Sequence, residues 1–366
     1  MLKIIDFIKN NPDWREILKT GPYNLSINDD GGFTILKYSQ INSDFNNEIV
    51  RECRGLIIDK NLNPVCVPFF KFGNYGEPYA AEIDWESAKV EEKIDGSLIK
   101  VWNYKGKWTV STNGTIFADK ATIGSESDSE ITNESKFKSF GDLFKAAIKN
   151  TGLEIESLDP GYTYMFELVS PYNRVVVPYE SIDLYHIGAR NNVSLTEAEV
   201  DTGVKKPKTY KCNNLSDLIE MASKLRYCEE GYVVKDKNYN RIKVKSPAYV
   251  AVQHLISGMS DKRMLELLKT NEIGEFLVYF PEYKKYADDL LAKTEKVAAY
   301  INNILRGEID GKIFETRKDY AAAVTKTKYP AFFFLYYDGK FKNPSDWLWS
   351  LPGDKILEQI EKSEKL

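Results

Sequence analysis

Residues 91–98 read EEKIDGSL, and this stretch places Lys93 at the end of one predicted strand. The Asp-Gly-Ser sequence after it is typical of a tight turn, and a second strand is predicted from Leu98. A lysine is a useful nucleophile only when its amine is neutral, so its pKa has to fall below the ordinary value of about 10.4. Desolvation or nearby cations can lower it. Lys93 is therefore a candidate nucleophile, although an ordinary surface hairpin is compatible with the same sequence.

Cationic residues occur in other predicted strands on both sides of Lys93. Arg54 stands at the mouth of a buried strand, Lys71 precedes Phe72, and residues 241–245 read RIKVK. Because alternate residues of a strand face the same side, Lys243 and Lys245 lie on one face. If these two lysines lie near Lys93, they lower its pKa and neutralise charge that develops on a phosphate. A solvated strand edge is the plain alternative for the two lysines.

Carboxylates complete the predicted pocket. Glu167 sits inside the apolar run at 165–168, where an unpaired charge would be unfavourable, and Glu230 precedes a glycine in EEGYVV at 229–234. Together with Asp95, these residues suit a divalent metal or a ribose. We therefore expect a pocket with one lysine nucleophile, several cations for a polyphosphate and carboxylates beside them. A buried ion pair is the plain alternative for Glu167.

Composition excludes several other classes of protein. The 366 residues carry 50 Lys+Arg against 54 Asp+Glu, a net charge of −4, so nucleic acid is not held by bulk charge alone. Residues 203–245 hold 11 Lys+Arg and 5 Asp+Glu, a local excess of six. We interpret this segment as a groove that follows a nucleic-acid backbone, with a solvated face as the alternative.

Cysteine and histidine usage argues against metal and redox centres. The four cysteines form no CxxC pair, and the two histidines form no HExxH motif, so zinc knuckles, redox motifs and most His-based sites lack their parts. Both histidines are interpreted as structural. No apolar run reaches the ~20 residues that a membrane span needs, and residues 1–9 read as a small amphipathic helix and not as a signal peptide. These features predict a cytoplasmic protein without a membrane partner.

The pattern of apolar residues along the sequence changes near residue 250. Before that point, short β-branched and aromatic runs predict strands, and two helical patterns interrupt them near 137–150 and 215–225. An exposed loop is expected over 121–134. After it, apolar residues recur at three-to-four spacing, which indicates helices over 261–270, 283–306, 315–325 and 354–366. We expect an α+β domain over 1–250 and an all-α domain over 251–366. The strands are predicted over 55–59, 98–104, 107–112, 162–169, 174–177, 231–235 and 241–245.

The ordered set of motifs resembles the covalent nucleotidyltransferases, and most of all the bacteriophage RNA ligase 1 family. The family pattern runs Glu-Cys-Arg-Gly, Lys-Phe, Lys-x-Asp-Gly-Ser, Phe-Glu-x-Val followed by Asn-Arg, Glu-Gly-Tyr and Lys-x-Lys-Ser. This chain shows these motifs at 52–55, 71–72, 93–97, 166–169 with 173–174, 230–232 and 243–246. One departure is Gly73, where an aromatic residue can follow Lys-Phe. The resemblance covers residues 30 to 250 and implies a nucleotidyltransferase domain built on antiparallel sheets with flanking helices.

The resemblance also implies roles for individual residues. Lys93, with Lys243 and Lys245, is the catalytic set, and Lys93 takes AMP from ATP as a phosphoramidate. Asp95 and Glu230 are implied to hold a hydrated Mg²⁺. Gly96 is implied to make room for the nucleotide, and Glu167 to bind its sugar. The implied nucleotide-binding residues are Tyr38, Arg54, Lys71, Glu92, Lys93, Gly96, Glu167, Glu230, Lys243 and Lys245.

The implied activity is ATP-dependent joining of a 5′-phosphate and a 3′-hydroxyl RNA end, through lysyl-AMP and RNA-adenylate intermediates. Family members often repair cleaved tRNA anticodon loops, with a polynucleotide kinase preparing the ends. A DNA ligase or a capping guanylyltransferase is the nearest alternative, but those proteins usually continue into a small β-barrel after Lys-x-Lys. A non-catalytic RNA-binding relative is the other alternative, and it predicts loss of motif residues that are all present here.

Overall fold

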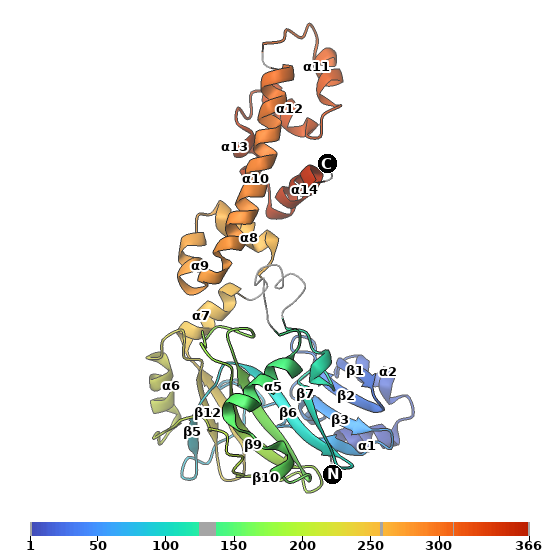
Figure 1. The fold of residues 1–366 in the computed structure, drawn as a ribbon, viewed down its shortest axis with the longest axis vertical. Helices are drawn as coiled ribbons and strands as arrows, with labels where there is room; N and C mark the ends of the chain where they lie inside the picture. The colour runs from blue at the N-terminus through green and yellow to red at the C-terminus, as the bar shows by residue number, and fades with distance from the viewer. Residues whose placement is uncertain (1, 124–136, 257–258, 310, 365–366) are drawn as a thin grey trace. The chain divides into compact units, whose positions relative to one another are not determined.

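The computed structural model describes residues 2–123, 137–256, 259–309 and 311–364. Within these ranges the chain forms two compact units (Figure 1). One comprises the described residues up to His254, and the other begins at Leu255. The first unit contains the sheets, and the second is helical. The mixed α+β fold class is therefore confirmed, with antiparallel sheets followed by helices.

Three antiparallel sheets build the first unit. Their strand orders are β1-β2-β3-β4, β10-β9-β8-β6-β7 and β11-β5-β12-β13. The strands are β1 (Leu25–Asp30), β2 (Phe33–Tyr38), β3 (Arg54–Asp59), β4 (Pro64–Cys66), β5 (Lys89–Glu92), β6 (Ser97–Tyr104), β7 (Lys107–Thr112), β8 (Tyr162–Val169), β9 (Asp183–Asn191), β10 (Glu197–Ala198), β11 (Thr209–Tyr210), β12 (Gly231–Lys235) and β13 (Arg241–Lys245).

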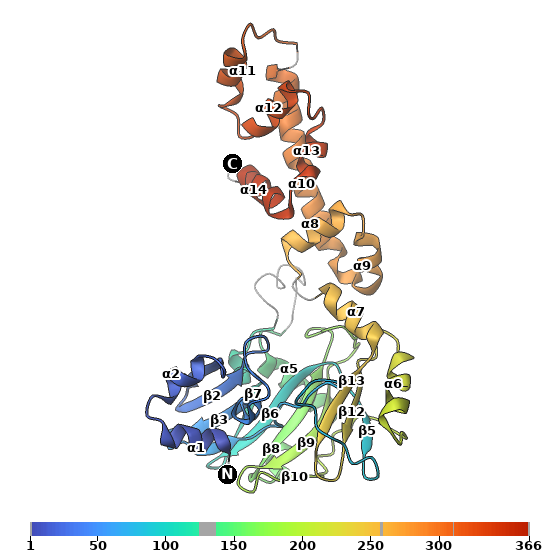
Figure 2. The ribbon, with the colours of Figure 1, turned by 180° about the vertical axis from the view of Figure 1, so that it is seen from behind.

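Helices lie beside the sheets, as Figures 1 and 2 show from opposite sides, and buried apolar side chains pack between them. Helices α1 (Lys3–Asn10), α2 (Trp14–Lys19) and α3 (Glu48–Glu52) pack on the first sheet. Helix α5 (Phe140–Thr151) packs on the second, and α6 (Leu215–Ser223) on the third. A smaller apolar cluster around Ile57 and Trp102 joins the first two sheets. Short 3₁₀ turns occur at η1 (Ala118–Lys120) and η2 (Ile155–Ser157).

The second unit is helical throughout its described residues. After α7 (Pro247–Ile256), which closes the first unit, come α8 (Asp261–Lys269), α9 (Ile273–Tyr279), η3 (Pro281–Tyr283), α10 (Lys284–Ile304), the π-helical turn η4 (Leu305–Ile309), α11 (Arg317–Val324), α12 (Pro330–Tyr337), α13 (Pro344–Ser350) and α14 (Gly353–Glu364). Buried apolar side chains along α10, among them Val297 and Ile301, line its core. None of the described helices combines the length and apolarity needed to cross a membrane.

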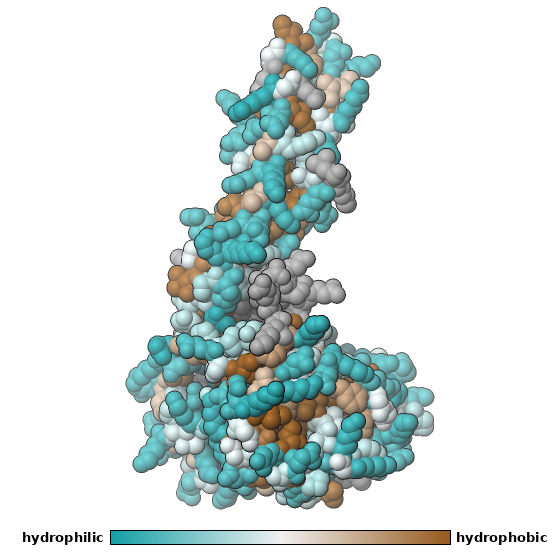
Figure 3. Space-filling view, in the orientation of Figure 1, coloured by the Kyte–Doolittle hydropathy of each residue, from teal (hydrophilic) through white to brown (hydrophobic). Residues whose placement is uncertain are grey.

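Most predicted elements are present, and one predicted strand is not. The seven strand predictions include residues 174–177, which form a loop, because the amides of Val176 and Val177 donate to Asp95 and not to a neighbouring strand. The four helices predicted after residue 250 are present, and α9, α12 and α13 were not anticipated. The loop expected over 121–134 lies outside the described residues from 124 onward. In Figure 3, hydrophilic side chains cover much of the visible surface, and a hydrophobic area is visible on the sheet-containing unit.

His186 is a structural residue with a measurable effect on stability. It lies on β9 at 2% exposure, and its ring centroid lies 5.3 Å from that of Phe166, with the two rings tilted by 42°. Burial, together with the nearby Lys206, lowers the pKa of His186 to about 4. The unfolded chain therefore takes up this proton at a higher pH than the folded protein, so stability is lost as the pH falls below about 6.5.

We expect His186→Phe to reduce the acid sensitivity of the fold. Between pH 7 and pH 5, the loss of unfolding free energy should shrink by about 2 kcal/mol relative to the unaltered protein. Denaturant unfolding at the two pH values measures this difference. An equal pH dependence in both proteins would contradict the assignment of His186 as a buried neutral group.

Candidate active site

Lys93 and Glu230 form the centre of the site. Lys93 follows β5, and its amide donates to the Gly231 carbonyl at 2.9 Å, which fixes it beside the start of β12. Its Nζ lies 2.6 Å from Glu230 Oε2, and Lys245 Nζ lies 3.1 Å from Glu230 Oε1. One buried carboxylate thus bridges two predicted catalytic lysines. A glycine is required at 231, where φ is +141° and a Cβ would come within 2.2 Å of the Val244 carbonyl oxygen.

The expectation that cations lower the pKa of Lys93 is wrong for the ligand-free protein. Burial lowers this pKa, but the carboxylates of Glu230, Glu167 and Asp95 outweigh burial and hold it above its ordinary value. The reason is geometric, because Glu230 lies nearer to the amine than any cation does. Lys93 is therefore protonated at neutral pH until these carboxylates are neutralised.

Lys243 is the lysine whose pKa falls. Burial, followed by the charges of Lys71, Lys93, Arg54 and Lys245, lowers the pKa of Lys243 to about 7. It forms no ion pair with the described residues, and its Nζ lies 5.4 Å from the centroid of the Phe72 ring. Strand β13 therefore carries one paired lysine and one unpaired lysine on the same face, next to Lys93.

Arg54 and Lys71 extend the cationic side of the site. Arg54 begins β3, lies 5.3 Å above the Phe72 ring, and has one buried guanidinium nitrogen without a hydrogen-bond partner. Burial and the charge of Arg54 lower the pKa of Lys71, whose Nζ donates to Gln40 at 3.3 Å. A buried donor without a partner is unfavourable, and an anion such as a phosphate would satisfy it.

The Tyr38 ring lies next to these cations. The ring is 3% exposed, packs edge-on against Phe45, and lies 5.3 Å from Lys71 Nζ. Its expected contact with a nucleobase stays a prediction. It contacts Lys71 and Phe45 and is hydrogen-bonded to Arg54 and Gln40, so its visible role is to position the two cations.

Glu167 is the carboxylate that remains available to a ligand. It lies on β8 opposite Leu98 and makes no hydrogen bond or ion pair within the described ranges. Burial raises the pKa of Glu167 to about 7, Lys93 and Arg54 lower it, and Glu230 raises it. A carboxylate with free oxygens beside the lysines could accept hydrogen bonds from sugar hydroxyls.

Asp95, by contrast, is already fully engaged. Its Oδ2 accepts from the amides of Val176 and Val177 at 2.9 and 2.8 Å, and its Oδ1 accepts from the Tyr249 hydroxyl at 2.8 Å. These contacts tie the turn after Lys93 to a loop and to α7. They show a positioning role for Asp95, and each of its oxygens already accepts at least one hydrogen bond.

Gly96 and Glu92 differ from their expected surroundings. A Cβ on Gly96 would come within 2.5 Å of the Leu168 carbonyl oxygen, so the glycine makes room for the end of β8. Glu92 pairs with Tyr232 across β5 and β12, and alternation along the strand turns it to the side opposite Lys93. Glu92 makes no contact with the lysine cluster in the part of the chain that the structure describes.

Sequence reasoning missed three residues of this cluster: Phe72, Tyr249 and Gln253. Tyr249 and Gln253 stand four residues apart on α7, so they share one face. Gln253 accepts from Lys245 Nζ at 3.2 Å, and Lys245 Nζ lies 5.2 Å from the Tyr249 ring. The available signal for Tyr249 and Gln253 was their position one and two helical turns after the Lys-x-Lys-Ser motif.

The basic groove predicted over 203–245 stays a prediction. Most of its cations are neutralised by ion pairs, and only Lys208, Lys211 and Lys243 lack one among the described residues. The paired cations are Lys205 with Asp183, Lys206 with Glu199, Lys224 with Glu220, Arg226 with Glu229, Lys235 with Glu91 and Glu199, Lys237 with Asp84, Arg241 with Glu197 and Lys245 with Glu230.

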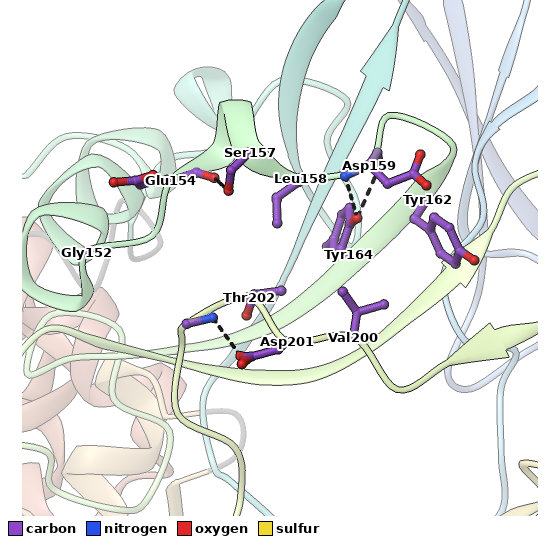
Figure 4. Close-up of a pocket in the computed structure, with 11 residues that line it drawn as sticks. Gly152, Glu154, Ser157, Leu158, Asp159, Tyr162, Tyr164, Val200, Asp201 and Thr202 are labelled. Atoms are coloured by element: carbon purple, nitrogen blue, oxygen red, sulfur yellow. Dashed lines mark hydrogen bonds between the residues drawn. The ribbon is translucent and has the colours of Figure 1, made fainter.

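A larger cavity elsewhere does not share this chemistry. It measures about 620 Å³ and lies between the end of α5, η2, the start of β8 and residues 200–203 (Figure 4). Its charged lining residues, Glu154, Asp159 and Asp201, are all acidic, and the Tyr164 hydroxyl is engaged by the Asp159 backbone. An acidic lining does not suit a phosphate, so the lysine cluster is the candidate site.

No cluster of three His, Cys, Asp or Glu side chains suited to a metal ion occurs within the described ranges. The oxygens beside Lys93 nevertheless fit Mg²⁺, which keeps several waters and is usually held by one or two carboxylates plus substrate phosphates. Glu230, whose two oxygens each accept from one lysine, and Asp95 are the carboxylates that would hold such an ion, Asp95 through water.

The chain is similar to proteins described as RNA ligases. The sequence profile of a family described as RNA ligase matches residues 52–249. A protein of Autographa californica nuclear polyhedrosis virus, described as a bifunctional polynucleotide kinase/RNA ligase, is 32% identical over 68% of this chain and 38% of its own length. An RNA ligase of Rhodothermus phage RM378 is 23% identical over 86% and 83%.

The chain thus spans about two fifths of the viral relative. Among solved structures, one form of an archaeal ATP-dependent RNA ligase aligns with a TM-score of 0.44 at 12% identity, over 92% of this chain and 99% of the other.

Proposed function

Because the chain belongs to the phage RNA ligase 1 family of RNA ligases, we propose that it is an ATP-dependent RNA ligase. The proposal assigns adenylyl transfer to residues 1–250 and the choice of RNA to the helical residues 251–366. The observation that carries it is the pairing of Lys93 and Lys245 with buried Glu230, next to Lys243 and Arg54, whose charges act on each other.

In the first step, the neutral amine of Lys93 attacks the α-phosphorus of ATP. A phosphorus–nitrogen bond forms, the bond to pyrophosphate breaks, and the amine loses its proton. Lys243, Lys245 and Arg54 bind the phosphates and stabilise the developing charge, and Glu167 accepts hydrogen bonds from the ribose. Mg²⁺, held by Glu230 and through water by Asp95, would supply further charge stabilisation when bound.

In the second step, AMP passes from Lys93 to the 5′-phosphate of an RNA end, and in the third a 3′-hydroxyl attacks that phosphate and AMP leaves. We assign cleaved tRNA anticodon loops in the cytoplasm as substrates, with a polynucleotide kinase that prepares the ends. This assignment is supported by the viral relative, whose description joins a kinase to a ligase.

Labelling with α-³²P-ATP and Mg²⁺ tests the proposal. We expect one acid-stable AMP per chain and chase of this label into 5′-phosphorylated RNA. Parallel reactions with GTP and with 5′-phosphorylated DNA distinguish a guanylyltransferase and a DNA ligase. Labelling by GTP but not ATP, transfer to DNA but not RNA, or no label at all would each refute the proposal.

A further inference from the structure

A second cavity adjoins the two catalytic lysines. It measures about 420 Å³ and is lined by Lys243 and Lys245 of β13, by Tyr75, by Ile219 of α6 and by Val250 of α7. The Lys93–Glu230 pair does not line it. Its volume is in the range of small-molecule sites, about 300–1,000 Å³. Apart from the two lysines, none of these residues has a role in the reaction described above.

Tyr75 is held rigidly at this cavity although it is half exposed. Its amide donates to the Lys243 carbonyl at 2.8 Å, and the Lys243 amide donates to the Gly73 carbonyl at 3.0 Å. Gly73 permits this path, because a Cβ there would come within 2.9 Å of Ala80 Cα. The backbone of residues 73–75 is therefore fixed against β13, which places Tyr75 beside Lys243.

The Tyr75 ring also lines a neighbouring apolar cavity of about 340 Å³, together with Trp85 and Ile242. Tyr75 is 50% exposed and is a lining residue of both cavities. An aromatic side chain that is fixed by its backbone but open to solvent is a surface on which a nucleobase can stack, and proteins use such rings for single-stranded RNA.

The polar groups around the cavity suit a nucleotide. Lys243 lacks an ion pair in the described chain and offers a charge to a phosphate. The buried side-chain oxygen of Asn74, another lining residue, has no hydrogen-bond partner, so it can accept from a base amino group or a sugar hydroxyl. Ile219 and Val250 supply an apolar floor.

We propose that this cavity binds the terminal nucleotide of the RNA strand that carries the 5′-phosphate. The base stacks on Tyr75 above Ile219 and Val250, and the 5′-phosphate lies at Lys243 and Lys245, which adjoin Lys93. The inference rests on the proposed ligase function and names the part of the substrate that the site takes. A 5′ end fits better than a 3′-hydroxyl end, because only the former carries a terminal phosphate monoester, whose charge is higher than that of a phosphodiester.

The test separates RNA binding from the reaction with ATP. Preformed protein–AMP is mixed with increasing amounts of a 5′-phosphorylated RNA oligonucleotide, and the half-saturating concentration for AMP transfer is measured. For Tyr75→Ala we expect this concentration to rise about tenfold or more, the loss typical of a removed base stack. Lysyl-AMP formation from ATP alone should proceed at the unaltered rate, and Tyr75→Phe should resemble the unaltered protein.

Two further variants sharpen the test. Ser223→Trp, at the end of α6, fills the same cavity from another element and should raise the half-saturating RNA concentration in the same way. Tyr210→Ala is the matched control, because Tyr210 is 38% exposed and lies on β11 at the opposite edge of the same sheet. It should leave AMP transfer to RNA unchanged.

A direct measurement of RNA affinity distinguishes failure of the RNA subsite from failure of the proposed ligase function. Fluorescence anisotropy with a labelled 5′-phosphorylated RNA should show the same losses in Tyr75→Ala and Ser223→Trp, and the 5′-hydroxyl form of this RNA should bind at least about tenfold more weakly. Equal RNA affinity in both variants, equal affinity for the two RNA forms, or a parallel fall of lysyl-AMP formation in Tyr75→Ala would overturn the subsite. If the two variants lose RNA affinity as expected but the protein forms no lysyl-AMP, the proposed ligase function is overturned and the RNA subsite is retained.

Discussion

Replacement of Lys93 by alanine should abolish the covalent AMP adduct. Two other lysines have the pKa expected of a nucleophile: Lys243, at about 7, and the fully buried Lys100 on β6, at about 8. Lys93 has a raised pKa. On pKa alone either of the others would be the better choice, so the assignment to Lys93 rests on family membership and on its place at Glu230. Mapping the modified peptide after labelling decides between the three.

The matched control is Lys100→Met. Lys100 donates to the Gly55 carbonyl and lies outside the Lys93–Glu230–Lys245 cluster, so this variant should keep the label. Lys93→Ala should also still seal RNA that already carries AMP on its 5′-phosphate, because that step needs no lysine nucleophile. Persistence of the label in Lys93→Ala, or its loss in Lys100→Met alone, would contradict the assignment.

The raised pKa of Lys93 also sets the pH dependence of the first step. Because only the neutral amine attacks, the rate of lysyl-AMP formation should rise with pH, by about tenfold per unit where this deprotonation is limiting. Rapid-quench measurements between pH 6 and pH 9 measure the slope. A rate that is flat or falls over this range would show that Lys93 is already deprotonated in the complex with ATP.

The second large effect concerns Lys243. Lys243→Ala should slow lysyl-AMP formation by about 10²- to 10³-fold, the usual loss when one charge-stabilising donor is removed from a transition state. The lysine also has a pKa of about 7 in the free protein. Its charge is therefore present at pH 6 and largely absent at pH 8, and binding of a triphosphate restores it by taking up a proton.

ATP affinity should consequently fall as the pH rises from 6 to 8. Glu167, with a pKa of about 7, acts in the same direction because it becomes negative over the same range. Lys243→Arg keeps its charge and should reduce the pH dependence, and Lys243→Arg combined with Glu167→Gln should remove most of it. Calorimetric titration at several pH values provides the measurement. An unchanged slope in the double variant would show that other groups titrate in the site.

The local pattern of the sequence predicted about half of the sheet framework. Short β-branched and aromatic runs marked six of the thirteen strands, and Lys105-Gly106 marked the hairpin between β6 and β7 correctly. Residues 174–177 misled because a β-branched run looks like a strand whether its amides meet a neighbouring strand or a side chain. Their partner is Asp95, about 80 residues earlier, which no local pattern reveals.

By itself, then, the sequence determined the family, the order of the motifs and the identity of the lysines, because these depend on residue type and on local periodicity. Only the tertiary structure decided their charges. Glu230 lies 137 residues from Lys93 in the chain but 2.6 Å away in space, and this contact raises a pKa that the residue types alone suggested would fall. The folded chain likewise paired most cations of 203–245 with distant acids and left Lys243 unpaired beside the cavity at Tyr75. Electrostatic interaction depends on distance and burial, and neither is written in the order of the residues.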